Sequence, residues 1–174
     1  MINSEKMLKH MAWANQEILS RVATLPDEAL DAYVVNPEWT AREIVQHIVR
    51  SSHFYGYRLQ MSSLAEVKER EEKRDAYLAA EKDLARSAEV LDFVKMLQIA
   101  DQTILNESYS DEGIVYREVD GKVIERARST IIFQAIHHAT EHRAQLVSAL
   151  EARGYSTINL DDFDLWAFAD RFGE

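Results

Sequence analysis

The chain has 174 residues, with 20 Lys and Arg against 30 Asp and Glu, which gives a formal net charge of −10. This charge, without any basic cluster, argues against nucleic acid as a partner, because binding to a polyanion needs grouped Lys and Arg. The absence of cysteine excludes disulfides, thiolate metal sites and a cysteine nucleophile, and it leaves six histidines as the strong nitrogen ligands.

Length and hydropathy bound the domain count and the location. We expect a single domain over residues 1–174, because the chain is long enough for one hydrophobic core. No apolar run approaches the roughly 20 residues of a membrane-spanning helix. Residues 1–13 lack the uninterrupted apolar stretch of a signal peptide. We therefore expect a cytoplasmic protein without a membrane partner.

The first third of the chain predicts two amphipathic helices. Apolar residues recur at helical spacing over residues 7–22, and the turn signal Leu-Pro-Asp at residues 25–27 ends this first helix. Thr40 and Glu43 have the spacing of a capping box, which predicts that the second helix begins after Thr40. Its apolar face continues to about Met61.

The middle of the chain predicts a long connection, a third helix and a hairpin. Residues 66–86 are dense in charge and indicate a solvated connection or an exposed helical extension, long enough to let the helices on either side run parallel. Residues 90–104 then place apolar side chains on one helical face. Alternating residues flank Asp120-Gly121, which predicts a small two-stranded hairpin within residues 113–128.

The last third predicts a long helix and a short one. The fourth helix begins near Ser129 or Thr130 and runs to Arg153, because Gly154 is a natural C-terminal stop. A final helix is expected over residues 161–171. These elements indicate an all-α fold class with one small hairpin.

Three of the six histidines share core-facing positions. His138 and His142 are four residues apart on the predicted fourth helix, so both imidazoles can reach one metal ion. They align with the apolar stripe of that helix, and two buried histidines must find hydrogen-bond acceptors or a metal. His47 lies on the apolar face of the second helix. Three inward imidazoles match a site with an open coordination position, as expected of a catalytic metal.

The same residues spell the pattern of inverted zinc proteases. In that pattern, His138-x-x-Glu141-His142, the glutamate would act as general base. Those enzymes need a further acidic ligand well downstream and a large α/β domain, whereas only 32 residues follow His142. We therefore interpret Glu141 as a surface residue or as an outer partner of a ligand.

The remaining candidates are weaker. His53 and His137 lie off the apolar stripes and are expected in solvent, and His10 borders the first stripe and is not expected to bind metal. Asp101 lies on the apolar face of the third helix. It could accept the second N–H of a ligating imidazole, or mark the edge of the stripe, which is the interpretation we favour.

The order of several motifs resembles the DinB/YfiT family over nearly the whole chain. The motifs are Trp13-Ala14-Asn15, Leu25-Pro26-Asp27, His47, Asp120-Gly121, His138-x-x-x-His142-Arg143-Ala144-Gln145-Leu146 and the acidic tail at residues 161–165. The resemblance implies a four-helix bundle of up-down-down-up topology, often a homodimer, in which His47, His138 and His142 hold a divalent metal ion. Ala144 replaces a glycine of many members, at a packing position.

The resemblance also implies a type of chemistry. Relatives in the wider superfamily are transferases and isomerases that use low-molecular-weight thiols. The expected function is a metal-dependent enzyme, a thiol S-transferase or a hydrolase, that acts on a small-molecule substrate after the ion acidifies a thiol or water. Imidazoles suit zinc, nickel, copper or iron, of which zinc or nickel is expected. A chain without cysteine would take its thiol from a low-molecular-weight cofactor.

Two alternative hypotheses make different predictions. A non-catalytic stress-response protein that binds a metal or small ligand would fill all four coordination positions itself, with Asp101 as a candidate fourth ligand. A purely structural role would keep His47, His138 and His142 as hydrogen-bonded core residues, without stoichiometric metal.

Overall fold

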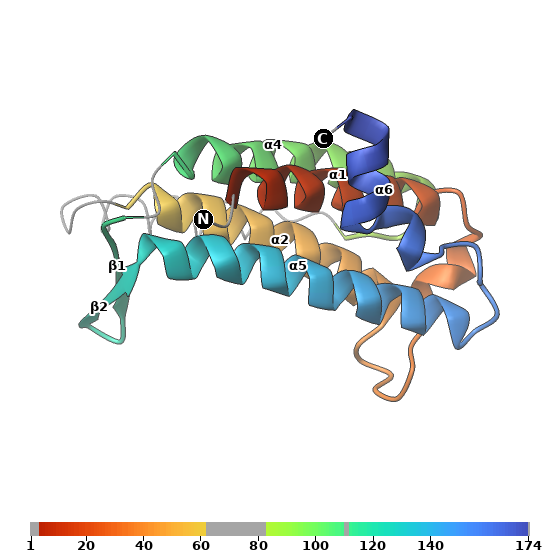
Figure 1. Ribbon diagram of the computed structural model, residues 1–174. Helices are drawn as coiled ribbons and strands as arrows, with labels where there is room; N and C mark the ends of the chain where they lie inside the picture. Colours follow the sequence, from red (N-terminus) through yellow and green to blue (C-terminus); the bar gives the residue numbers. More distant parts are fainter. Residues whose placement is uncertain (1–3, 62–82, 110–111, 174) are drawn as a thin grey trace.

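The computed structural model describes residues 4–61, 83–109 and 112–173. These ranges are mainly helical, with one two-stranded antiparallel sheet (Figure 1), which confirms the predicted class. Most of the charged connection predicted at residues 66–86 lies outside the described residues. The elements in chain order are α1 (Ser4–Val22), η1 (Asp27–Asp31), α2 (Ala41–Leu59), η2 (Ser87–Glu89), α4 (Val90–Glu107), β1 (Ile114–Val119), β2 (Lys122–Ala127), α5 (Arg128–Glu151), η3 (Leu160–Phe163) and α6 (Leu165–Phe172).

Local side-chain bonding sets the start of α2. The Thr40 hydroxyl accepts a hydrogen bond from the Glu43 backbone N–H at 3.3 Å, as an N-cap does. The carboxylate of Glu43 lies 4.0 Å from the guanidinium of Arg50, about two turns further along the helix. The helix ends at Leu59, close to the predicted end.

The predicted hairpin is confirmed, and its turn chemistry explains it. Asp120 and Gly121 have φ angles of 51° and 71°. Two consecutive residues at positive φ form the type I′ turn, whose twist matches that of the flanking strands. Val119 therefore pairs with Lys122, and the ladder extends to Ile114 and Ala127.

The predicted final helix at 161–171 is wrong in one respect, because the segment forms two helices. The backbone of Asp164 is extended between η3 and α6, with ψ of −179°. Its carboxylate accepts a hydrogen bond from the Ala167 N–H at 2.8 Å. Asp164 thus caps α6, and this side-chain bond replaces the helical continuation that apolar periodicity alone suggested.

The four long helices lie side by side (Figure 1), with α2 against α4 and α5, and α1 against α4 and α5. Their apolar faces form two separate clusters of buried residues. One cluster contains Ile18, Leu97 and Leu146, and the other contains Leu8 and Ile104. A polar layer, described below with the site, lies between them. Within the described ranges, no helix is both long enough and apolar enough to span a bilayer.

Arg128, the first residue of α5, joins the ends of three helices. Its side chain is buried, at 7% exposure, and its guanidinium donates to the backbone carbonyl of Leu59 at 2.6 Å and to that of Glu107. A cation at the C-terminal ends of α2 and α4 also interacts favourably with their dipoles. The contact fixes α5 relative to α2, the two helices that carry the candidate histidines.

Replacement of Arg128 by alanine is therefore expected to lower the free energy of unfolding by about 2–4 kcal/mol, because buried carbonyls lose charge-assisted hydrogen bonds. Arg126→Ala is the matched control, since Arg126 is exposed and donates a hydrogen bond to the neighbouring Glu125 carbonyl. That variant should stay within about 0.5 kcal/mol of the wild type. Chemical denaturation measures both, and equal effects would contradict the role of Arg128.

Candidate metal centre

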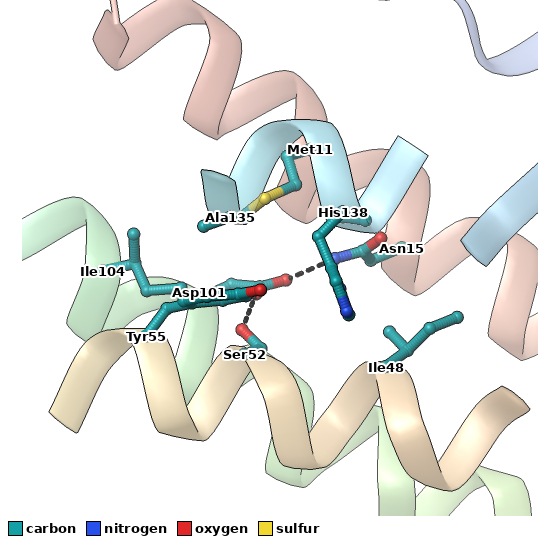
Figure 2. A pocket seen from close by; sticks show the side chains of 10 residues that line it. Met11, Asn15, Ile48, Ser52, Tyr55, Asp101, Ile104, Ala135 and His138 are labelled. Atoms are coloured by element: carbon teal, nitrogen blue, oxygen red, sulfur yellow. Dashed lines mark hydrogen bonds between the residues drawn. The ribbon is translucent and has the colours of Figure 1, made fainter. Parts of the chain in front are cut away.

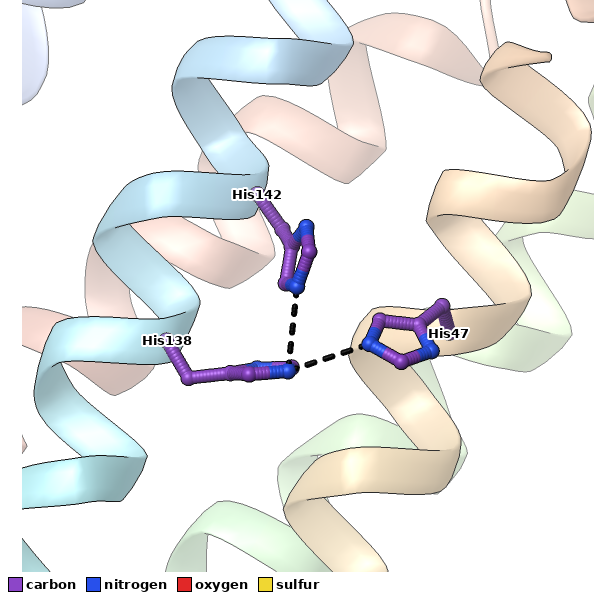
Figure 3. Close-up of side chains that lie close together, drawn as sticks. All are labelled: His47, His138 and His142. Atoms are coloured by element: carbon purple, nitrogen blue, oxygen red, sulfur yellow. Dashed lines mark hydrogen bonds between the residues drawn. The ribbon is translucent and has the colours of Figure 1, made fainter. Parts of the chain in front are cut away.

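Three imidazoles meet between α2 and α5 (Figure 3). His47 extends from α2, while His138 and His142 extend from successive turns of α5. The Nε2 atom of His138 lies 3.0 Å from the Nε2 atom of His47 and 3.0 Å from that of His142. The structure thus brings together the three histidines that the sequence singled out.

The spacing of these nitrogens fits a metal ion after a small adjustment. One ligand atom from each histidine lies within 4.8 Å of the other two. Nitrogens bound to zinc at about 2.0–2.1 Å in a tetrahedral site are separated by roughly 3.3 Å. The observed separations lie close to this value, so the donor set suits a divalent ion. Metal ligation by these residues stays a prediction.

The protonation states of His138 and His47 also suit a metal. Burial, followed by repulsion from His142 and His47, lowers the pKa of His138 to about 4. Burial and repulsion from His142 likewise lower the pKa of His47 below its ordinary value. Both imidazoles are therefore neutral near pH 7, and metal binding requires neutral imidazole.

Gln145 determines which nitrogen of His142 faces the cluster. The Trp39 indole N–H donates to Gln145 Oε1 at 3.0 Å, and an indole N–H can only donate, so the Gln145 atom at this point is the carbonyl oxygen. His142 Nδ1 lies 2.9 Å from the same oxygen and must carry the proton. Nε2 of neutral His142 is then bare and presents its lone pair to the cluster, as a ligating histidine requires.

Two aromatic rings pack against the cluster. The ring centroid of Trp39 lies 5.2 Å from that of His47 and 5.7 Å from that of His142, with both pairs edge to face. Tyr55 makes a similar contact with His138, at 5.5 Å. These contacts restrict the positions of the imidazoles. The Ser51 hydroxyl lies 3.4 Å from His47 Nε2 and adds a polar group beside the nitrogens.

Trp39 and Gln145 are functional candidates that the sequence pattern did not single out. Gln145 follows His142 by three residues, a spacing at which helical side chains meet. That spacing is the sequence feature that could have identified Gln145 as a partner of His142. Trp39 precedes the helix that carries His47, and only the packing of α2 against α5 brings its ring to His142.

A buried polar layer crosses the four long helices next to the cluster, and Figure 2 shows three of its four members, Asn15, Ser52 and Asp101. Arg143 Nη1 donates to Asn15 Oδ1 at 2.7 Å, and Asn15 Nδ2 donates to Asp101 Oδ2 at 3.0 Å. The Ser52 hydroxyl donates to the other carboxylate oxygen of Asp101. Each helix contributes one member, and all four side chains are buried. The chain of bonds links a buried cation to a buried anion through one amide.

The expectation that Asp101 marks the edge of an apolar stripe is wrong. Asp101 is 2% exposed, because Asn15 and Ser52 satisfy its carboxylate inside the protein. The hydrogen-bond partners of its carboxylate, Asn15 and Ser52, are not members of the histidine cluster. Asp101 and His138 instead line a common cavity of about 10 Å³, about the size that holds one water molecule (Figure 2).

The other titratable candidates lie outside the cluster. His137 and Glu141 are exposed, as expected for surface positions. His10 is buried and bonds through Nε2 to the Phe163 carbonyl at 2.8 Å. The expectation that His53 is in solvent is wrong, because its ring faces α4 and hydrogen-bonds to the backbone of Met96, and burial lowers its pKa.

The burial of Asp101 generates a pH-dependent prediction. Burial raises the pKa of Asp101 from 3.8 to about 6, against the opposing effect of its hydrogen bonds to Ser52 and Asn15. The folded protein then holds the Asp101 proton more tightly than the unfolded chain does. The protonated Asp101 therefore contributes fully to the free energy of unfolding below about pH 4, and this contribution is lost as the pH rises through about 6. The difference amounts to about 3 kcal/mol.

Asp101→Asn removes the ionisable carboxyl group and keeps every histidine. It is therefore the reference against which the pH dependence of the wild type is compared. The free energy of unfolding of the wild type minus that of the variant should be larger at about pH 4.5 than at about pH 7.5. Denaturant titrations at both pH values measure the difference. A difference that stays constant, or that grows with pH, would contradict the raised pKa.

Comparisons with known proteins agree with the sequence resemblance. Residues 1–171 match the family model described as DinB family. Searches of curated proteins and of solved structures found no significant match. The match extends over almost the whole chain and includes all four polar-layer residues and the three clustered histidines. The chain therefore belongs to the DinB family.

Proposed function

We propose that the protein is a metal-dependent enzyme in which His47, His138 and His142 hold a divalent metal ion, zinc or nickel. The observation that supports this proposal best is the convergence of their Nε2 atoms, with the 3.0 Å separations of His138 from both neighbours. The Gln145 carbonyl adds support, because it keeps the proton of His142 on the nitrogen that faces away.

The proposed reaction is thiol S-transfer or hydrolysis on a small-molecule substrate. A divalent ion held by three neutral imidazoles keeps its charge uncompensated and lowers the pKa of a thiol or water at the remaining position. Gln145 orients His142, Trp39 and Tyr55 pack against the imidazoles, and the Ser51 hydroxyl lies beside His47 Nε2. The thiol would come from a low-molecular-weight cofactor, because the chain has no cysteine.

An open coordination position favours catalysis over storage of a metal. The storage hypothesis needs a fourth ligand from the protein, and Asp101 was the candidate. Its two oxygens accept hydrogen bonds from Asn15 and Ser52. Among the described residues, the cluster of possible ligands contains the three histidines and no carboxylate.

We also propose the up-down-down-up topology for the four long helices. Two contacts support it. Arg128 at the start of α5 bonds to the ends of both α2 and α4. At the other end, the Ser87 N–H donates to the Asp27 carboxylate at 2.8 Å, which connects the segment after α1 with the segment before α4. The homodimer that the resemblance implies stays a prediction.

Metal analysis of purified protein tests the site. We expect about one divalent ion per chain in the wild type and almost none in His142→Ala, which loses one of three ligands. His137→Ala is the matched control, since the neighbouring imidazole is exposed and lies outside the cluster. It should keep the wild-type metal content. Equal metal content in all three proteins would refute the proposed ligands.

Cobalt substitution distinguishes the two reaction types. If the site activates a thiol, low-molecular-weight thiols should change the visible absorption spectrum of the cobalt-loaded protein, because thiol sulfur is a soft ligand for a divalent ion. The same thiols added to His142→Ala should change nothing. A response to carboxylates alone would instead favour hydrolysis.

A further inference from the structure

A second cavity lies beside the histidine cluster and is not used by the proposed metal site. It lies between the connection that precedes α2, residues 34–39, and the second half of α5. Its volume is about 380 Å³. This volume falls within the range of pockets that hold small organic ligands, and it greatly exceeds the single-water cavity beside Asp101.

The lining of this cavity, called the side pocket below, is uncharged and mostly apolar. Val34, Val35 and Ile44 line it from the connection and α2, and Ala144 and Ala149 line it from α5. None of the side chains that line it carries a charge. Val34 is 56% exposed and Val35 is 85% exposed, so both keep apolar surface in water that a ligand could cover.

Trp39 and Gln145 form a wall that the side pocket shares with the histidine cluster. Both residues line the pocket. On the cluster side, the Trp39 ring contacts His47 and His142, and Gln145 accepts from His142 Nδ1. The carbonyl oxygen of Gln145 is already used by Trp39 and His142, so its amide N–H groups are the part that a ligand can use.

We propose that the side pocket binds an uncharged alkyl or aromatic group of the substrate, with a carbonyl-type oxygen accepting from the Gln145 amide. Identifying this ligand with the substrate rests on the proposed function. The uncharged lining selects against ionic groups, because a charge would lose its hydration without gaining a partner. The shared wall places the bound group next to the proposed metal ligands, so the rest of the molecule can extend past Trp39.

The volume of the side pocket suits a small molecule. Ala144 and Ser148 lie about one turn apart on α5 and line the pocket, and Val34 and Val35 line it from the connection before α2. A ligand in the pocket would contact both segments. An aromatic ring introduced at either α5 position would occupy the same space, which makes the proposal testable without altering a histidine.

The experiment is a fluorescence titration with N-phenyl-1-naphthylamine, a neutral apolar probe, on the purified full-length protein. We expect saturable binding to the wild type, and binding weakened by about tenfold or more in Ala144→Phe. Ser148→Phe is a second pocket-filling variant, because Ser148 is exposed and tolerates a larger side chain. Thr130→Phe adds the same ring at an exposed position near the start of α5 and should bind within about twofold of the wild type.

Metal content, measured on the same samples, separates this proposal from the proposed function. Pocket-filling variants that keep their metal but lose the probe would support the side pocket as a site of its own. His142→Ala should bind the probe even if it lacks metal. Equal probe affinity in the wild type and both pocket-filling variants, or no saturable binding to the wild type, would overturn the side-pocket proposal and leave the metal site untouched.

Discussion

The polar layer between the two apolar clusters is the constraint on which the arrangement of the helices depends. Asn15, Ser52, Asp101 and Arg143 come from four different helices, and each is buried. A buried charge or amide without a partner costs several kcal/mol, so each hydrogen bond in the series from Arg143 to Ser52 is needed for the stability of the fold. Sliding any one helix by a turn would break at least one of these bonds, whereas the apolar contacts on either side would tolerate such a shift better.

The polar layer also supports the site. Asn15, Ser52 and Asp101 line the same small cavity as His138, and Arg143 follows His142 in α5. The cation of Arg143 is buried, which lowers its pKa to about 10, while the carboxylate of Asp101 opposes that decrease. The imidazoles therefore project from helices whose relative positions are fixed by hydrogen bonds. A constellation built on rigid helices holds its geometry better than one built on loops.

Much of the fold was predictable because its signals are local. The Thr40 cap, the Asp120-Gly121 turn and the apolar periodicity each act within a few residues, so they predicted α2, the hairpin and the long helices. The errors arose where a distant partner decides the outcome. The sequence pattern placed Asp101 at the edge of an apolar stripe, but Asn15 and Ser52 hydrogen-bond to its carboxylate inside the protein. The pattern also placed His53 at the surface, but its ring hydrogen-bonds to the backbone of Met96 in α4. At the C-terminus, a single capping carboxylate divided one expected helix into two.

The sequence by itself determined the family, the helical class and the three histidines on core-facing stripes, because residue type and spacing encode these features directly. Only the tertiary structure decided that the three Nε2 atoms converge, that Gln145 and Trp39 set the tautomer of His142, and that a side pocket lies behind the same pair. The physical reason is that these features depend on the packing of α2 against α5. Their residues lie 91 and 106 positions apart in the pairs His47–His138 and Trp39–Gln145.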